Sequence, residues 1–299
     1  MPTSPSLILA TLLLLGATAP TEVELTSLTL TDNLRSRTIP VQIAFPTPLP
    51  ATKLPLVIVS HTGGGNAEQL QPLLSKLALA GYLAVAPTHE DSAVGSGGGA
   101  ASRPRQPLRA GVPLWESRVK DISHLTAADW DKLLPTLAGK IDTSKVAVIG
   151  FGQGAYTALL VGGALPVWNK TPADLRDARV SALVLLSPPP SNQQGLTPTS
   201  FSKLSLPILS IASPSPTTRP TPSPHDLSPE GNKFMLSLTG ATAATLLPIR
   251  KDTPTSNAAT LVTIAFLDAF LKSDPAAKDL LVSGSVIAGI RDIATFQSR

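Results

Sequence analysis

The sequence predicts an α/β protein with a mostly parallel sheet of eight strands and helices on both of its faces. Short apolar runs alternate along the chain with amphipathic stretches of helical period, which is the pattern of a parallel sheet covered on both faces. Residues 146–159 read as a strand, a sharp glycine turn and a helix. The length of 299 residues and the apolar fraction of 42% suit one large core. We therefore expect a single domain over residues 20–299.

The strands and helices follow from the local patterns. Residues 22–31 and 38–45 alternate apolar and polar side chains, so we expect them to pair as a hairpin at an edge of the sheet. More continuous apolar runs predict buried strands at residues 54–60, 82–87, 145–149, 181–186, 206–212 and 233–238. Apolar residues at helical spacing predict helices at residues 66–80, 115–134, 153–162 and 258–271. The glycine-rich residues 88–112 are predicted to form a long loop, and loops of that length are usually functional or disordered.

The composition excludes several classes of function. The net charge is only +4, and the Lys and Arg residues are scattered rather than clustered, so no nucleic-acid partner is expected. The chain has no cysteine, which excludes disulfides, thiolate metal sites and a cysteine nucleophile. Its four histidines show neither helical pairing nor a cluster of carboxylates around them, so neither a metal nor a cofactor is expected.

The N-terminus has the pattern of a secretory signal. Residues 7–16 form an apolar run that is too short to span a bilayer. Ala17 and Ala19 then give the small-x-small pattern of a cleavage site. We therefore interpret residues 1–19 as a signal peptide and expect a secreted or periplasmic protein without a stable membrane span.

The glycine turn within residues 146–159 has the layout that holds the nucleophile of a hydrolase. Residues 150–154 read Gly-Phe-Gly-Gln-Gly, whereas the G-x-S-x-G elbow carries a central serine whose hydroxyl attacks an acyl carbon. Gly152 stands in the place of that serine. The fold and the activity therefore have to be argued separately.

A second motif follows the strand predicted at residues 54–60. Residues 60–65 read Ser-His-Thr-Gly-Gly-Gly, and glycines at such a place let backbone N–H groups turn toward a carbonyl oxygen. Together with the elbow, these residues resemble the α/β-hydrolase superfamily, and within it the bacterial proteins related to platelet-activating-factor acetylhydrolase and dienelactone hydrolase. The resemblance spans about residues 38–272 and rests on residues 60–64, 81–89, 118–121, 150–159 and 183–188.

The resemblance implies an α/β-hydrolase fold in which all three catalytic positions are vacant. Gly152 occupies the position of the nucleophile, Ala243 that of the histidine base, and the region around Ser215 that of the acid. Nucleophile, base and acid act as a unit. We therefore expect a protein of carboxylic-ester hydrolase lineage that is catalytically impaired.

The resemblance also implies which residues face a ligand. The N–H groups of Gly63 and Gln153 would form the oxyanion hole, and His61 and His89 would lie near its mouth. These groups suit a small-molecule acyl or carbonyl ligand. The elbow can form without its serine, because glycine readily adopts the strained backbone conformation at position 152.

Two alternatives remain open. The first is an active esterase or lipase-like hydrolase that uses displaced residues, such as the pair His225 and Asp226. The second is a dinucleotide-binding protein, because Gly150-x-Gly152-x-x-Ala155 also fits the G-x-G-x-x-A fingerprint directly after a strand.

Overall fold

A computed structural model describes residues 20–93, 114–213, 222–246 and 252–299, without the side chains of Ala243 and Ala244. The strands of the main sheet are β1 (Glu22–Asp32), β2 (Arg37–Thr47), β3 (Leu54–Ser60), β4 (Leu83–Pro87), β5 (Ile141–Phe151), β8 (Val180–Leu186), β9 (Ile208–Ala212), β10 (Lys233–Leu238) and β11 (Ala294–Ser298). A small hairpin is formed by β6 (Val167–Trp168) and β7 (Thr171–Pro172).

The α-helices are α1 (Gln71–Leu79), α2 (Leu114–Thr126), α3 (Trp130–Leu133), α4 (Gln153–Gly162), α5 (Pro224–Leu227), α6 (Ala243–Leu246), α7 (Pro254–Phe270) and α8 (Pro275–Val282). Short 3-10 turns are η3 (Glu68–Leu70), η4 (Pro135–Leu137), η5 (Pro198–Phe201) and η6 (Ser285–Ile287).

The sheet confirms the predicted class and adds one strand. Its order is β1-β2-β4-β3-β5-β8-β9-β10-β11. The six strands from β4 to β10 run parallel, while β1 and β2 form the predicted antiparallel hairpin and β2 also runs antiparallel to β4. The sheet thus has nine strands instead of eight, because β11 joins the far edge antiparallel to β10. This strand is short and depends on a long-range contact, in which the ring of Phe296 stacks on that of Phe234 at 5.9 Å.

Two helices also differ from the prediction. The stretch 115–134 forms two helices instead of one, since α2 ends at Thr126 and the side chain of Asp129 caps a new helix by accepting the N–H of Lys132. The helix predicted from residue 258 begins at Pro254. Thr253 caps it with a reciprocal capping box, and proline is favoured in the first helical turn.

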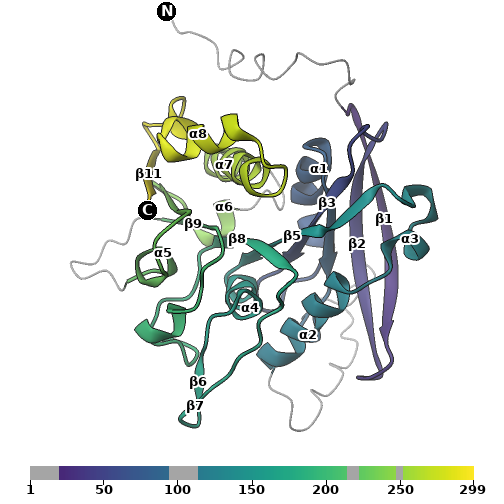
Figure 1. Cartoon of the computed structure of the whole chain (residues 1–299), viewed down its shortest axis with the longest axis horizontal. Helices are drawn as coiled ribbons and strands as arrows, with labels where there is room; N and C mark the ends of the chain where they lie inside the picture. The colour runs from purple at the N-terminus through teal and green to yellow at the C-terminus, as the bar shows by residue number, and fades with distance from the viewer. Residues whose placement is uncertain (1–19, 94–113, 214–221, 247–251) are drawn as a thin grey trace, which may run out of the picture.

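Side chains of the central strands alternate between two cores. In β5, Val146 and Val148 belong to the core beneath α2 and α4, whereas Ala147 and Ile149 belong to the core beneath α1, α7 and α8. Figure 1 shows these two groups of helices on opposite sides of the sheet. Burial of both faces explains why the central strands are continuous apolar runs.

The order of the strands indicates where a sheet of this kind would bind a ligand. Along the chain β3 is followed by β4 on one side of it, and the chain then returns to place β5 on its other side. In open α/β sheets, ligands bind beyond the carboxyl ends of the strands at the point where the order reverses. That point lies between the ends of β3 and β5. The order also differs from the 3-2-1-4-5-6 order of dinucleotide-binding domains, which counts against the dinucleotide alternative.

Candidate functional site

The end of β5 turns sharply into α4 at Gly152. This residue has φ of 54° and ψ of −109°, a conformation that favours glycine because a Cβ atom would be strained there. Its N–H donates to the carbonyl of Leu186 in β8 over 2.9 Å. The predicted elbow is therefore present as a backbone structure with no side chain at its apex.

The two glycines that flank the apex are required by close backbone packing. A Cβ atom on Gly150 would overlap the carbonyl group of Gly154, and one on Gly154 would overlap the carbonyl group of Ser60. The strand, the helix and the loop after β3 approach one another too closely for any larger residue. The pattern of small residues around the elbow thus has a steric cause.

The loop of residues 61–65 lies against the elbow. A Cβ atom placed on Gly152 would be 3.0 Å from the hydroxyl oxygen of Thr62, and one placed on Gly63 would be 3.6 Å from the Cβ of Gln153. Gly63 is exposed, and Gly152 and Gln153 are half-buried. The structure therefore brings together the vacant apex and both of the predicted donors at an accessible place.

Among the described residues, neither backbone donor meets an acceptor, so both N–H groups can bind an oxygen atom of a ligand. The N–H of Gly63 has no acceptor within the part of the chain that the structure describes. The N–H of Gln153 belongs to the first turn of α4, where helical N–H groups lack intrahelical acceptors and carry partial positive charge. Such a pair suits the oxygen of a carbonyl or a carboxylate.

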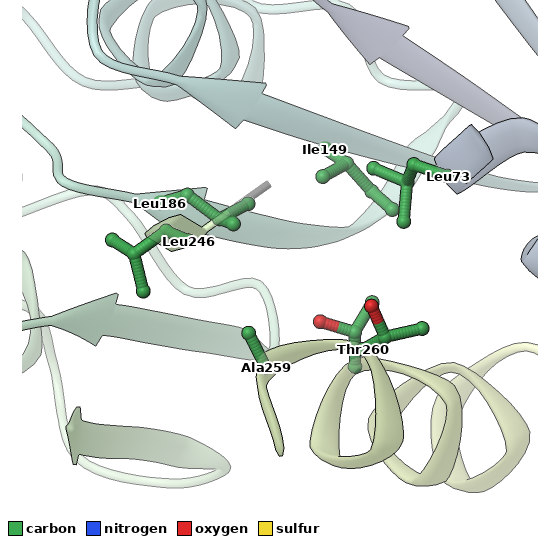
Figure 2. Close-up of a pocket in the computed structure, with 7 residues that line it drawn as sticks. Leu73, Ile149, Leu186, Leu246, Ala259 and Thr260 are labelled. Atoms are coloured by element: carbon green, nitrogen blue, oxygen red, sulfur yellow. The ribbon is translucent and has the colours of Figure 1, made fainter. Parts of the chain in front are cut away.

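The vacant base position lies at the start of the short helix α6. Ala243 is the first residue of α6, and Leu246 at the end of α6 lines a small apolar cavity together with Leu186, the residue that accepts the N–H of Gly152. Figure 2 shows Leu246 beside Leu186 in this cavity, across from Leu73 and Ile149. The cavity has room for about one water molecule. The vacant acid region at Ser215 lies outside the described residues.

Comparison with known families gives the same superfamily. Residues 41–171 match the model of the dienelactone hydrolase family. Over this stretch the chain is similar to that family, and its mostly parallel sheet has the α/β-hydrolase fold. The matched stretch includes the loop after β3 and the elbow, whereas the acid and base regions follow it in the sequence. No curated protein shows a significant match to the chain.

Two histidines predicted near the mouth of this site are buried instead. His61 and His89 are 1% and 2% exposed, and their rings are 4.8 Å apart. The backbone N–H of His89 donates to Nε2 of His61 over 2.9 Å. Because Nε2 of His61 is an acceptor, Nδ1 carries the proton and donates to the carbonyl of Thr62 over 2.6 Å. These histidines hold the loop and do not face a ligand.

A buried Ser-His-Asp relay lies next to these histidines. The hydroxyl of Ser60 and Nε2 of His89 are 2.9 Å apart, and Nδ1 of His89 and Oδ2 of Asp121 are also 2.9 Å apart. The connections are those of a catalytic triad. However, Ser60 is fully buried and packs through its carbonyl against Gly154, so a substrate cannot reach its hydroxyl. The relay is a structural link and not a displaced nucleophile.

Burial sets the proton state of both histidines. Burial and the charge of Arg118 lower the pKa of His89 to about 4. Burial, followed by the effects of His89 and Arg118, lowers the pKa of His61 to about 2. Both rings are therefore neutral near pH 7 and resist the protonation that a general base must undergo.

Asp121 is the centre of the buried charges on this side of the sheet. It is fully buried and pairs with Arg35 and Arg37, each over 2.9 Å, in addition to His89. Burial would raise the pKa of Asp121, but its hydrogen bonds from His89 and Arg37 outweigh burial and hold the pKa far below its ordinary range. The carboxylate thus ties α2 to β2 and to the chain after β4.

Sequence reasoning gave Arg118 and Asp121 no role of their own. Both are buried on the same side of α2 as the apolar Val119, Ile122 and Leu125. Charged residues within the apolar stripe of a helix are the signal that could have identified them, because buried charges are almost always paired.

His225 and Asp226 lie near the start of β10, at the end of the sheet where the parallel strands begin. The carbonyls of both residues accept hydrogen bonds from the side chain of Arg299, and the backbone of Arg299 pairs with that of Lys233 at the start of β10. The elbow lies beyond the ends of the parallel strands. The pair is therefore not placed to serve the elbow.

Neither a cluster of metal ligands nor a membrane-spanning helix occurs among the described residues. In these parts of the chain, His, Asp and Glu do not gather in threes as metal ligands. Over the same ranges, the helices are too short or too polar to cross a bilayer.

Proposed function

We propose that this α/β-hydrolase protein binds a small acyl, carbonyl or carboxylate ligand at the elbow and has lost ordinary ester hydrolysis. The observation that carries the proposal is the accessible pair of N–H groups of Gly63 and Gln153 beside a vacant apex at Gly152. Preorganised donors of this kind bind an oxygen without reorganisation.

The loss of hydrolysis follows from the chemistry of the groups at the elbow. Thr62 brings the hydroxyl nearest to the apex, but a hydroxyl is a weak nucleophile without an adjacent base. The nitrogen atoms of His61 and His89 are already engaged in the buried hydrogen bonds behind the loop. Neither of these two histidines is therefore available as a base to activate the hydroxyl of Thr62.

Active-site labelling tests the loss of hydrolysis. We expect no stoichiometric labelling by a fluorophosphonate and no burst with an activated aryl ester, because the elbow carries no serine. Slow turnover is compatible with the proposal, since enzymes without a triad keep roughly 10³ to 10⁴-fold acceleration over water. Stoichiometric label on any serine would show that the chain has an active nucleophile.

Ligand titration tests the binding site. With butyrate as the probe, we expect the amide NMR signals of Gly63 and Gln153 to shift more than the amide signals of the other described residues. Butylammonium has a similar size and the opposite charge, and it is the matched control because the two N–H groups repel a cation. Equal shifts with both compounds, or no shift at either residue with butyrate, would contradict the proposal.

We further propose that the protein is exported and that its mature chain begins at residue 20. The support is the apolar run of residues 7–16 followed by Ala17 and Ala19. N-terminal sequencing of the protein recovered from the exported fraction decides this point. An Ala19→Arg variant should remain uncleaved, because the residue before the cleavage site has to be small. An exported unmodified protein that still begins with Met1 would contradict the proposal.

A further inference from the structure

The carbonyl groups of the loop after β3 converge on one buried arginine. Nη1 of Arg118 donates to the carbonyl of His61 over 2.8 Å, and Nη2 donates to the carbonyl of Thr62 over 3.1 Å. The carbonyl of Thr62 also accepts from Nδ1 of His61 and, over 3.1 Å, from the N–H of Gly65. Three donors therefore fix the orientation of the peptide between Thr62 and Gly63.

This orientation decides where the neighbouring N–H groups point. In a trans peptide the C=O and the N–H point in opposite directions. With the carbonyl of Thr62 held toward Arg118, the N–H of Gly63 points away from the buried charges. Gly63 also lies beside the elbow, since a Cβ on Gly63 would be 3.6 Å from the Cβ of Gln153.

Arg118 is itself held rigidly in place. Its Nε and Nη2 donate to the two carboxylate oxygens of Asp91, each over 3.0 Å, and the side chain is fully buried at the middle of α2. The planar guanidinium thus spans a carboxylate on one side and two carbonyls on the other. A lysine has a single charged nitrogen and cannot reproduce this geometry.

We propose that Arg118 is the positioning residue for the ligand-binding N–H of Gly63. It fixes the peptide between Thr62 and Gly63 through the two carbonyls, and Asp91 fixes Arg118. The inference rests on the proposed function only for the ligand, because the orientation of the peptide is a property of the free protein.

The test compares Arg118→Lys with Arg179→Lys in the full-length protein. Arg179 is the control because it also donates to both oxygens of an aspartate, Asp177, and to a backbone carbonyl, that of Ser123. It immediately precedes β8, at the opposite end of the parallel strands from the elbow. In the free protein, we expect Arg118→Lys to move the carbonyl ¹³C signals of His61 and Thr62 and the amide signal of Gly63. Arg179→Lys should leave all three signals unchanged.

The butyrate titration then separates the two proposals. Arg118→Lys should weaken butyrate binding about tenfold, as expected for the loss of one hydrogen bond to a charged group, and abolish the response of Gly63 while that of Gln153 persists. Unchanged carbonyl signals in folded Arg118→Lys would overturn the positioning role whatever butyrate does. Moved carbonyl signals in a protein that never binds butyrate would support the positioning role and contradict the proposed function.

A second variant covers the case in which Arg118→Lys does not fold. Asp91→Asn keeps the arginine and removes the charge that orients it. We expect the same changes at His61, Thr62 and Gly63, in smaller amplitude. Unchanged signals at all three residues in Asp91→Asn would contradict the proposal.

Discussion

The hydroxyl oxygen of Thr62 lies 3.0 Å from the point that a Cβ atom on Gly152 would occupy. The space beside the apex of the elbow is therefore bounded by a polar group from the loop after β3. A side chain introduced at position 152 would contact Thr62. The loop after β3 therefore limits which side chains position 152 can accommodate.

We predict that Gly152→Ser alone does not restore esterase activity. The new side chain would press on Thr62, and its hydroxyl would lack a general base and stay protonated near neutral pH. Adding Ala243→His should help only if that histidine reaches position 152, and an acid would still be lacking. The measurement is kcat/KM on a short-chain aryl ester for both variants and the unmodified chain. A large gain from the single change would mean that a base is already in place.

Replacing Gly154 by alanine should destabilise the protein by about 3 kcal/mol or more. The added Cβ would overlap the carbonyl of Ser60, and overpacking against backbone that cannot move is costly. Gly63→Ala is the matched control, because a Cβ there meets its nearest neighbour at an ordinary 3.6 Å. Urea unfolding of both variants gives the free energies, and similar values for the two would refute the steric account of the elbow.

Asp121→Asn should lower the free energy of unfolding by about 3–5 kcal/mol, since removal of one partner leaves buried charges uncompensated. Arg37 would lose its carboxylate and Arg35 one of its two, and the single amide oxygen could not accept all the hydrogen bonds that the two carboxylate oxygens accept from these arginines and His89. Asp129→Asn serves as the control. Its ion pair with Lys132 is exposed, and asparagine caps a helix as well as aspartate does. The unfolding midpoint in urea should hardly move for the control.

Stability should fall as the pH drops below about 6.5. The pKa values of His89 and His61 are lowered in the folded protein to about 4 and about 2. Below about pH 6.5 these histidines are therefore protonated in the unfolded chain while they are still neutral in the folded protein. For each histidine, the free energy of unfolding then falls by about 1.4 kcal/mol per pH unit as the pH drops from the unfolded to the folded pKa value. Unfolding free energies measured from pH 7 to 4.5 check this, and His89→Gln should reduce the slope. An unchanged slope in that variant would show that His89 does not contribute.

The local sequence was enough for the fold class and for the position of the elbow. Burial on both faces of the sheet requires a continuous apolar run, such as residues 54–60. Close packing of the backbone at the elbow requires glycine at positions 150 and 154. Both requirements act on residues near one another in the sequence, so they can be recognised from it. The vacancy at Gly152 could likewise be read directly from the sequence. The vacant positions at Ala243 and Ser215 depended on the resemblance.

Only the tertiary structure decided which polar groups border the proposed ligand site and which are buried beneath it. The resemblance implied that His61 and His89 face a ligand, yet both are buried. His89 bonds to Ser60 and Asp121, and His61 accepts the backbone N–H of His89. Arg118 reaches the loop after β3 across more than fifty residues of sequence. Such roles depend on contacts between segments far apart in the chain, and those contacts leave no periodic pattern in the sequence because each involves a single side chain.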